Sequence, residues 1–272
     1  MPTPFEHLIY ADLVLNHPGL PAQLRELLHR QIGPFLLGTT AADVQSITGQ
    51  GRVETHFYRL SEGRDGSPAD KMLSLYQELA HPEELPPARA AYITGYLVHL
   101  AWDEVWAWDI FVPFYRDGQQ WPDRANSRTR EFFVHHNALR VWLDRTAYAG
   151  LRDNAAIPGL LRETVSDHWL PFAPDWALAQ WRDWLVEQLE DPSLIQTAEV
   201  FAKRLHVPVP RLEAIVAEMT AGTYITVPGI EAALASYEAA ALTESLQTVL
   251  RYWEIQRRLD CMLVTEMTGS AT

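Results

Sequence analysis

The sequence predicts an all-α protein, and three observations support this fold class. Apolar residues recur at helical spacing through most of the chain, and capping signals precede several of these segments. The alternation that strands require is absent, apart from a short candidate strand at residues 223–227. With 272 residues, of which 47% are hydrophobic and 11% aromatic, the chain can bury a large core. We therefore expect a multi-helix bundle.

Recognisable signals mark where the helices begin. Thr3, followed by Pro4 and then by Glu6, forms a capping-box start for a helix over residues 4–16. Two consecutive prolines open a long apolar helix over residues 88–110. A short helix followed by a Gly/Thr/Ser loop is expected over residues 33–50. Further helices are expected over residues 21–32, 69–80, 128–145, 157–168, 174–190, 197–205 and 230 to about 266.

Composition and charge exclude several classes of function. The 35 acidic and 22 basic residues give a net charge of −13, which repels phosphate backbones, so nucleic-acid binding is not expected. The first residues lack the pattern of a secretion signal, so we expect a cytoplasmic protein. Cys261 is the single cysteine, which excludes an internal disulfide and a thiolate zinc site. Any metal would be held by His, Asp and Glu, which suits zinc, with manganese or iron as alternatives.

A domain boundary is expected near residue 191, where a tryptophan-rich region gives way to an alanine-rich one. Residues 1–190 would form a metal-binding helical domain, and residues 191–272 a C-terminal helical region packed on it. A single domain is the alternative. The long apolar helix contains His99 and Asp103, so we expect it to be buried in the protein and not to span a membrane.

The same apolar helix carries the clearest functional signal. His99 and Asp103 are one helical turn apart on one face, so both can reach a single ion. A buried, ionised Asp103 is costly unless it is paired or coordinated. A hydrogen-bonded pair without any ion fits the same spacing, and the spacing alone favours that interpretation.

Three segments extend this pattern toward a metal site. They cover residues 34–45, 52–58 with a Thr-His-Phe motif, and 95–106 with a His-x3-Asp motif. Their order, together with a histidine near the N-terminus, resembles the zinc-dependent phospholipase C family, to which fungal single-strand nucleases are distantly related. The resemblance covers residues 1 to about 115. The matching positions are His7, Asp43, His56, His99 and Asp103.

The resemblance implies a phospholipase C/nuclease-like bundle with additional C-terminal helices. It also implies ligand roles: one zinc would be held by Asp43, His56, His99 and Asp103. Asp103 would bridge to a second ion held by His7. Trinuclear members of the family place further ligands downstream, where this chain has Asp109, His135 and His136 as possible additional ligands. Because these residues depart from the family's pattern, we expect one or two zinc ions.

The leading functional hypothesis is a metal-dependent hydrolase of phosphoester bonds, in which zinc-type ions activate water. Asp43 would be the catalytic carboxylate that orients or deprotonates this water. A small phosphoester or a phospholipid is the expected substrate. The alternative is a non-catalytic helical protein, acting through protein partners, in which a structural metal or an ion-free His/Asp cluster holds the fold together.

Overall fold

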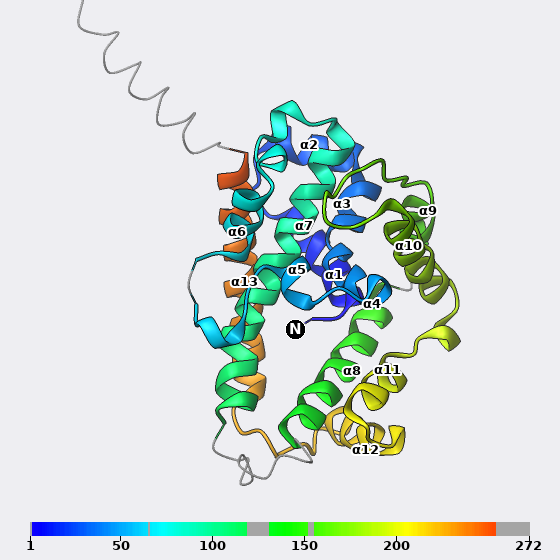
Figure 1. Ribbon diagram of the computed structural model, residues 1–272. Helices are drawn as coiled ribbons and strands as arrows, with labels where there is room; N and C mark the ends of the chain where they lie inside the picture. The colour runs from blue at the N-terminus through cyan, green and yellow to red at the C-terminus, as the bar shows by residue number, and fades with distance from the viewer. Residues whose placement is uncertain (1, 65, 119–130, 152–154, 254–272) are drawn as a thin grey trace, which may run out of the picture.

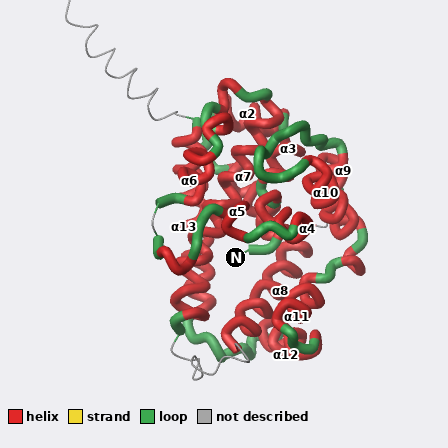
Figure 2. Tube along the Cα trace, viewed as in Figure 1, coloured by secondary structure: helices red, strands yellow, loops and turns green. Residues whose placement is uncertain are grey.

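The helices of this protein pack around one long interior helix, α7 (Pro87–Val105). The computed structural model describes residues 2–64, 66–118, 131–151 and 155–253. Within these ranges every regular element is helical and no strand occurs, which confirms the all-α prediction (Figure 1, Figure 2). Among the described helices, none has the length and apolar character needed to cross a membrane.

The helices on either side of α7 have the following bounds. Before α7 lie α1 (Pro4–Asn16), α2 (Ala22–Arg30), α3 (Ile32–Gly38), η1 (Ala41–Val44), α4 (Gln45–Thr48), α5 (Arg52–His56), η2 (Leu60–Glu62), α6 (Pro68–Leu75), η3 (Gln77–Leu79) and η4 (Pro82–Glu84). After it come η5 (Trp106–Arg116), α8 (Glu131–Leu151), α9 (Ala156–Arg162), α10 (Asp175–Glu190), η6 (Pro192–Leu194), α11 (Thr197–Leu205), α12 (Val209–Thr220) and α13 (Ile230–Tyr252).

Several helix ends differ from the sequence prediction. α9 stops at Arg162 and does not continue to residue 168, because the Thr164 hydroxyl bonds to the Leu160 carbonyl at 2.9 Å and closes the last turn. The candidate strand at residues 223–227 is a loop between α12 and α13. The predicted end of the last helix near residue 266 lies outside the described residues, as does Cys261.

The long apolar helix changes its winding at Trp106. Regular turns continue to Val105, and η5 then proceeds to Arg116 with the wider turns of a π-helix. Pro113 lies inside η5 and has no N–H to pair with a carbonyl four residues earlier, so wider turns accommodate it. From residue 90 to residue 105 every side chain of α7 is buried, as the sequence predicted.

Two apolar cores hold the bundle together. In the larger core α7 is packed between α3 and α13. In the smaller core Val134 and Val141 of α8 pack against Phe201 of α11 and Leu212 of α12. The C-terminal helices therefore lie against the N-terminal part of the chain. The division at residue 190 stays a prediction.

α3 and α7 approach each other so closely that only glycine fits at two positions. A Cβ atom on Gly38 would lie 2.1 Å from the carbonyl oxygen of Tyr92. A Cβ atom on Gly95 would lie 2.2 Å from the carbonyl oxygen of Phe35. Because neither glycine has a side chain, the two helix backbones touch. This contact sets Thr39, at the end of α3, against the middle of α7.

We expect Gly95→Ala to lower the free energy of unfolding by about 3 kcal/mol, because the added methyl group overlaps backbone atoms that move only if the helices separate. Gly159→Ala on α9 is the matched control, since a methyl group there meets no atom within 4 Å. Alanine in that helix should stabilise the protein by about 0.5–1 kcal/mol. Urea unfolding monitored by circular dichroism measures both variants, and a Gly95→Ala protein of unchanged stability would contradict the close contact.

Candidate metal centre

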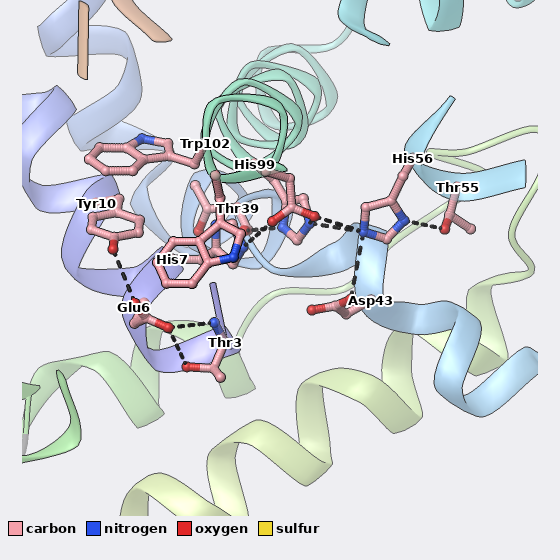
Figure 3. A network of polar contacts seen from close by, with 12 residues as sticks. Thr3, Glu6, His7, Tyr10, Thr39, Asp43, Thr55, His56, His99 and Trp102 are labelled. Carbon is pink, nitrogen blue, oxygen red and sulfur yellow. Dashed lines mark hydrogen bonds and ion pairs between the residues drawn. The ribbon is translucent and has the colours of Figure 1, made fainter. Parts of the chain in front are cut away.

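Five side chains from distant parts of the sequence meet beside α7. Figure 3 labels four of them: His7, Asp43, His56 and His99. The three histidines are fully buried, Asp103 is 1% exposed, and the Asp43 side chain retains 19% exposure. These are the five residues that the sequence predicted to be metal ligands, and the structure brings them together. They come from α1 (His7), η1 (Asp43), α5 (His56) and α7 (His99 and Asp103).

The ligand atoms of His56, His99 and Asp103 have the spacing of a tetrahedral metal site, and Asp43 Oδ1 lies beside His56. His56 Nε2 lies 3.3 Å from His99 Nε2 and 3.3 Å from Asp103 Oδ2. It lies 3.6 Å from Asp43 Oδ1, and His99 Nε2 lies 3.6 Å from Asp103 Oδ2. Ligand atoms about 2.0–2.1 Å from a tetrahedral zinc are roughly 3.3 Å from one another. The measured spacing therefore fits one such ion.

Hydrogen bonds on the far side of two rings direct their lone pairs toward this centre. His99 Nδ1 donates to the carbonyl oxygen of Thr39 at 2.8 Å, so a neutral His99 carries its lone pair on Nε2. Thr55 Oγ1 lies 2.9 Å from His56 Nδ1 and 3.3 Å from the Arg52 carbonyl oxygen. The hydroxyl can donate to that carbonyl while it accepts the Nδ1 hydrogen. Two Nε2 lone pairs that face each other at 3.3 Å then repel unless a positive charge lies between them.

His7 fits a second ligand position. Its ring stacks on that of His99, with centroids 3.8 Å apart and 15° between the planes. His7, His99 and Asp103 form a second group of candidate ligands, whose ligand atoms all lie within 4.8 Å of one another. Asp103 connects the two positions, because Oδ1 lies 3.5 Å from His7 Nε2 while Oδ2 faces His56. Within the described part of the chain, His7 Nε2 and Asp103 Oδ1 have no hydrogen-bond partner, as expected of ligand atoms that face a cation, and His7 Nδ1 has none either.

Burial and neighbouring charges set the protonation states of the cluster. Burial lowers the pKa of His7 and that of His56 to about 4, so both rings are neutral at pH 7 and able to bind a metal. Burial also lowers the pKa of His99, but the Asp103 carboxylate outweighs it, and the pKa is raised overall. Although burial raises the pKa of Asp43 and Asp103, their cationic neighbours hold both below the usual range. Both carboxyl groups are therefore ionised at neutral pH.

Arg52 is a site residue that the sequence reasoning missed. Its guanidinium, at the start of α5, bonds to Asp103 Oδ2 and lies 3.7 Å from Asp43 Oδ1. Two carboxylates and one guanidinium give the cluster a charge of −1 when its histidines are neutral. The signal that could have found Arg52 is its position one helical turn before His56, which puts both on one face of α5.

Contacts from α7 and from aromatic side chains fix the end of α5. The Tyr96 hydroxyl donates to the Thr55 carbonyl oxygen at 2.7 Å. Phe57, the next residue after His56, has a left-handed φ of 58°, which residues other than glycine rarely adopt. Its ring packs edge-on against Phe172 with centroids 5.3 Å apart, and this burial holds the strained backbone. The direction of the His56 ring is thereby fixed.

The three possible additional ligands are not brought to the centre. His136 Nε2 accepts the Nε1 hydrogen of Trp106 at 3.0 Å, and His135 Nδ1 lies 3.0 Å from the Tyr224 hydroxyl. The Asp109 side chain, on η5, is 43% exposed. The expectation that these residues add ligands is corrected accordingly: aromatic partners hold the two histidines of α8, and Asp109 faces solvent.

We expect wild-type protein to retain about one zinc ion per chain after exhaustive dialysis, and His99→Ala to retain none, because His99 belongs to both ligand groups. Elemental analysis measures the metal content. Added zinc should raise the melting temperature of the wild type and not that of His99→Ala, because it binds only a folded state that has the site. His29→Ala, exposed on α2, is the matched control. If the wild type held no zinc, manganese or iron and His99→Ala melted like the wild type, the metal centre would be disproved.

The start of α1, which positions His7, is held by a buried carboxyl group. Glu6 accepts hydrogen bonds from the Thr3 N–H at 2.8 Å, the Thr3 hydroxyl at 3.1 Å and the Tyr10 hydroxyl at 3.2 Å (Figure 3). Burial raises the pKa of Glu6 from 4.5 to about 7, although the Thr3 backbone bond lowers it. The folded protein therefore keeps this group protonated over a range in which the unfolded chain has lost the proton.

A raised pKa stabilises the folded state fully below pH 4.5, and this contribution is lost as the pH rises through about 7. Glu6→Gln imitates the protonated group and lacks this dependence. We expect the free energy of unfolding of Glu6→Gln minus that of wild type to rise by about 3 kcal/mol between pH 4.5 and about pH 8, because only the wild type loses stability over this range. Chemical denaturation across this range measures the difference, with exposed Glu78→Gln as control. A difference that does not change with pH would contradict the raised pKa.

No family model, no curated protein and no solved structure matches this chain. The likeness to the zinc-dependent phospholipase C family therefore rests on the ordered motif residues alone. A function has to be argued from the geometry and charge of the centre.

Proposed function

We propose that this protein is a metal-dependent hydrolase of phosphoester bonds, which uses one or two zinc-type ions to activate water. The observation that carries the proposal is the convergence of three buried histidines and two ionised carboxylates at ligand spacing. Imidazole and carboxylate ligands are typical of catalytic zinc, whereas structural zinc sites are usually rich in cysteine. In addition, Asp43 and Arg52 line a cavity, so the centre is accessible from one side.

The residues of the centre divide the work between binding and proton transfer. Bound zinc supplies a Lewis acid and lowers the pKa of water to about 7. His56, His99 and Asp103 would hold the first ion, and His7 would hold the second with the other oxygen of Asp103. Asp43 is the most exposed member of the cluster and is ionised, so it would orient the attacking water and accept its proton.

The charge of the centre favours a phosphoester over a neutral ester or amide. One divalent ion changes the charge of the cluster from −1 to +1, and an anionic substrate then restores neutrality in a site of low dielectric constant. The guanidinium of Arg52 lies in the cavity wall, where its N–H groups suit phosphate oxygens. A neutral substrate would leave the +1 charge of the metal-loaded cluster unbalanced.

A non-catalytic helical protein is the second candidate, and one observation favours it. The Nε2 atoms of His56 and His99 are close enough to share a proton. A shared proton would give both atoms a hydrogen-bond partner without any metal ion. In that case the cluster would stabilise the fold, and the protein would act through partners.

We expect zinc-loaded wild type to hydrolyse bis(p-nitrophenyl) phosphate, with release of p-nitrophenolate measured by absorbance. Asp43→Asn should lower kcat by about 100-fold or more, because it removes the group that accepts the proton. Asp12→Asn, an exposed change on α1, should leave kcat unchanged. Chelation should abolish the activity, and added zinc should restore it.

Two further substrates extend this assay to other esters. p-Nitrophenyl phosphate tests for a monoester, and p-nitrophenylphosphorylcholine tests for a lipid headgroup. Wild-type protein that carries a full complement of zinc and cleaves none of the three compounds would rule out the hydrolase in favour of the non-catalytic protein.

A further inference from the structure

A cavity of about 480 Å³ adjoins the metal centre. Asp43 and Arg52 belong both to its wall and to the centre. Most of the remaining wall comes from α8, α10 and α11, helices that lie outside the part of the chain resembling the phospholipase C family (Figure 1). More than half of the cavity wall therefore lies outside the part of the chain that carries the resemblance.

Positive charge dominates the cavity wall. Three arginines line it, Arg52, Arg140 and Arg204, against Asp43 as the acidic residue. The cavity wall is therefore positively charged, although the whole chain has a net charge of −13. Arginine N–H groups match the oxygen atoms of phosphate, so the wall selects an anionic ligand.

Arg140 is held in place on the wall by its own contacts. Its guanidinium lies over the ring of Phe201, 4.3 Å from the centroid, and Nη1 donates to Asn137 Oδ1 at 3.2 Å. Burial lowers the pKa of Arg140, but arginine stays charged at neutral pH. The negative charge of Asp43 raises the pKa of Arg140, so the guanidinium lies within electrostatic reach of the metal centre.

An apolar surface stands beside the arginines. Trp181 and Trp184, one turn apart on α10, have ring centroids 5.2 Å from each other. Trp181 is buried and fixed by a bond from Nε1 to Thr40 Oγ1 at 3.1 Å. Trp184 is 37% exposed although it is large and apolar. Trp181, Trp184 and Phe201 all line the cavity, and their rings suit an aromatic ring or a short aliphatic chain.

We propose that this cavity binds a small aryl or short-chain alkyl phosphoester. Its phosphate group would face Arg52 and Arg140, and its organic group would lie against Trp184. The inference rests on the proposed function and names the substrate class of the same site. A cavity of about 480 Å³ has the size of a site for one small molecule, which argues against a diacyl phospholipid as the natural occupant.

Phenylphosphonate tests the proposal, because its carbon–phosphorus bond is not an ester and the compound binds without being hydrolysed. Isothermal titration calorimetry would measure its affinity for zinc-loaded and zinc-free protein, with methylphosphonate as the ligand that lacks the ring. We expect wild type to bind phenylphosphonate about tenfold more tightly than methylphosphonate. Part of this preference should persist without zinc, because the tryptophans supply it.

Two variants separate the apolar and the charged parts of the cavity. Trp184→Ala should weaken phenylphosphonate binding about tenfold and leave methylphosphonate binding unchanged. Arg140→Gln should weaken the binding of both ligands by about tenfold or more. The controls are Trp176→Ala, which changes a 60% exposed tryptophan of α10 outside the cavity, and Arg30→Gln on the surface of α2. Because Arg140 is partly buried, thermal unfolding verifies that its variant folds, and Trp184 gives an independent result.

The outcomes distinguish this inference from the proposed function. Equal affinities of wild type and both variants for phenylphosphonate, or no preference over methylphosphonate, would overturn the cavity assignment even if phosphoesters are hydrolysed. The expected binding pattern without hydrolysis of any ester would support the cavity and overturn the hydrolase. Faster cleavage of phosphatidylcholine vesicles than of soluble aryl phosphodiesters would also overturn the assignment.

Discussion

The centre depends on the contact between the backbones of α3 and α7. Because Gly38 and Gly95 lack side chains, the end of α3 reaches α7, and the carbonyl of Thr39 accepts the Nδ1 hydrogen of His99 at 2.8 Å. This bond selects the tautomer and the direction of the ring, as outer hydrogen bonds do for metal-binding histidines. His7 then stacks on that ring, and the facing histidine of α5 meets its Nε2. A packing requirement between two backbones therefore decides the chemistry of a side chain.

Much of the site was predictable from the sequence, because helical period and the order of motifs are local properties. The one-turn spacing of His99 and Asp103 predicted their shared face, and the order of the other ligands added three more residues. The role of the Thr39 carbonyl could not be predicted from the sequence, because every residue has a carbonyl and only tertiary packing places this one beside His99. His135 and His136 were possible additional ligands although they depart from the family's pattern, and aromatic neighbours decide where their rings lie. The wider turns of η5 likewise depend on Pro113, and the spacing of apolar residues in the sequence does not reveal them.

Either a shared proton or a divalent cation can supply positive charge between the facing histidines. A proton satisfies the His56–His99 pair only. Within the described residues it leaves both His7 nitrogens and Asp103 Oδ1 without hydrogen bonds. A buried polar atom without a partner costs about 1–3 kcal/mol, so the proton alone leaves a considerable penalty in place. Cations bound by Asp103 would engage His7 Nε2 and Asp103 Oδ1 as well as the facing histidines, and the balance therefore favours metal over the ion-free cluster.

Arg52 links the number of ions to the charge of the substrate. It already neutralises one of the two carboxylates, so one divalent ion leaves the centre at +1, and two ions leave it at +3. A phosphodiester carries one negative charge and matches the centre with one ion. With two ions a phosphomonoester dianion leaves a charge of about +1 and a phosphodiester leaves about +2, and because uncompensated positive charge in a buried site is costly, a filled second position favours the monoester. If the metal position at His7 is filled only when such a dianion is present, the charge of the bound ester determines how many metal ions the centre holds.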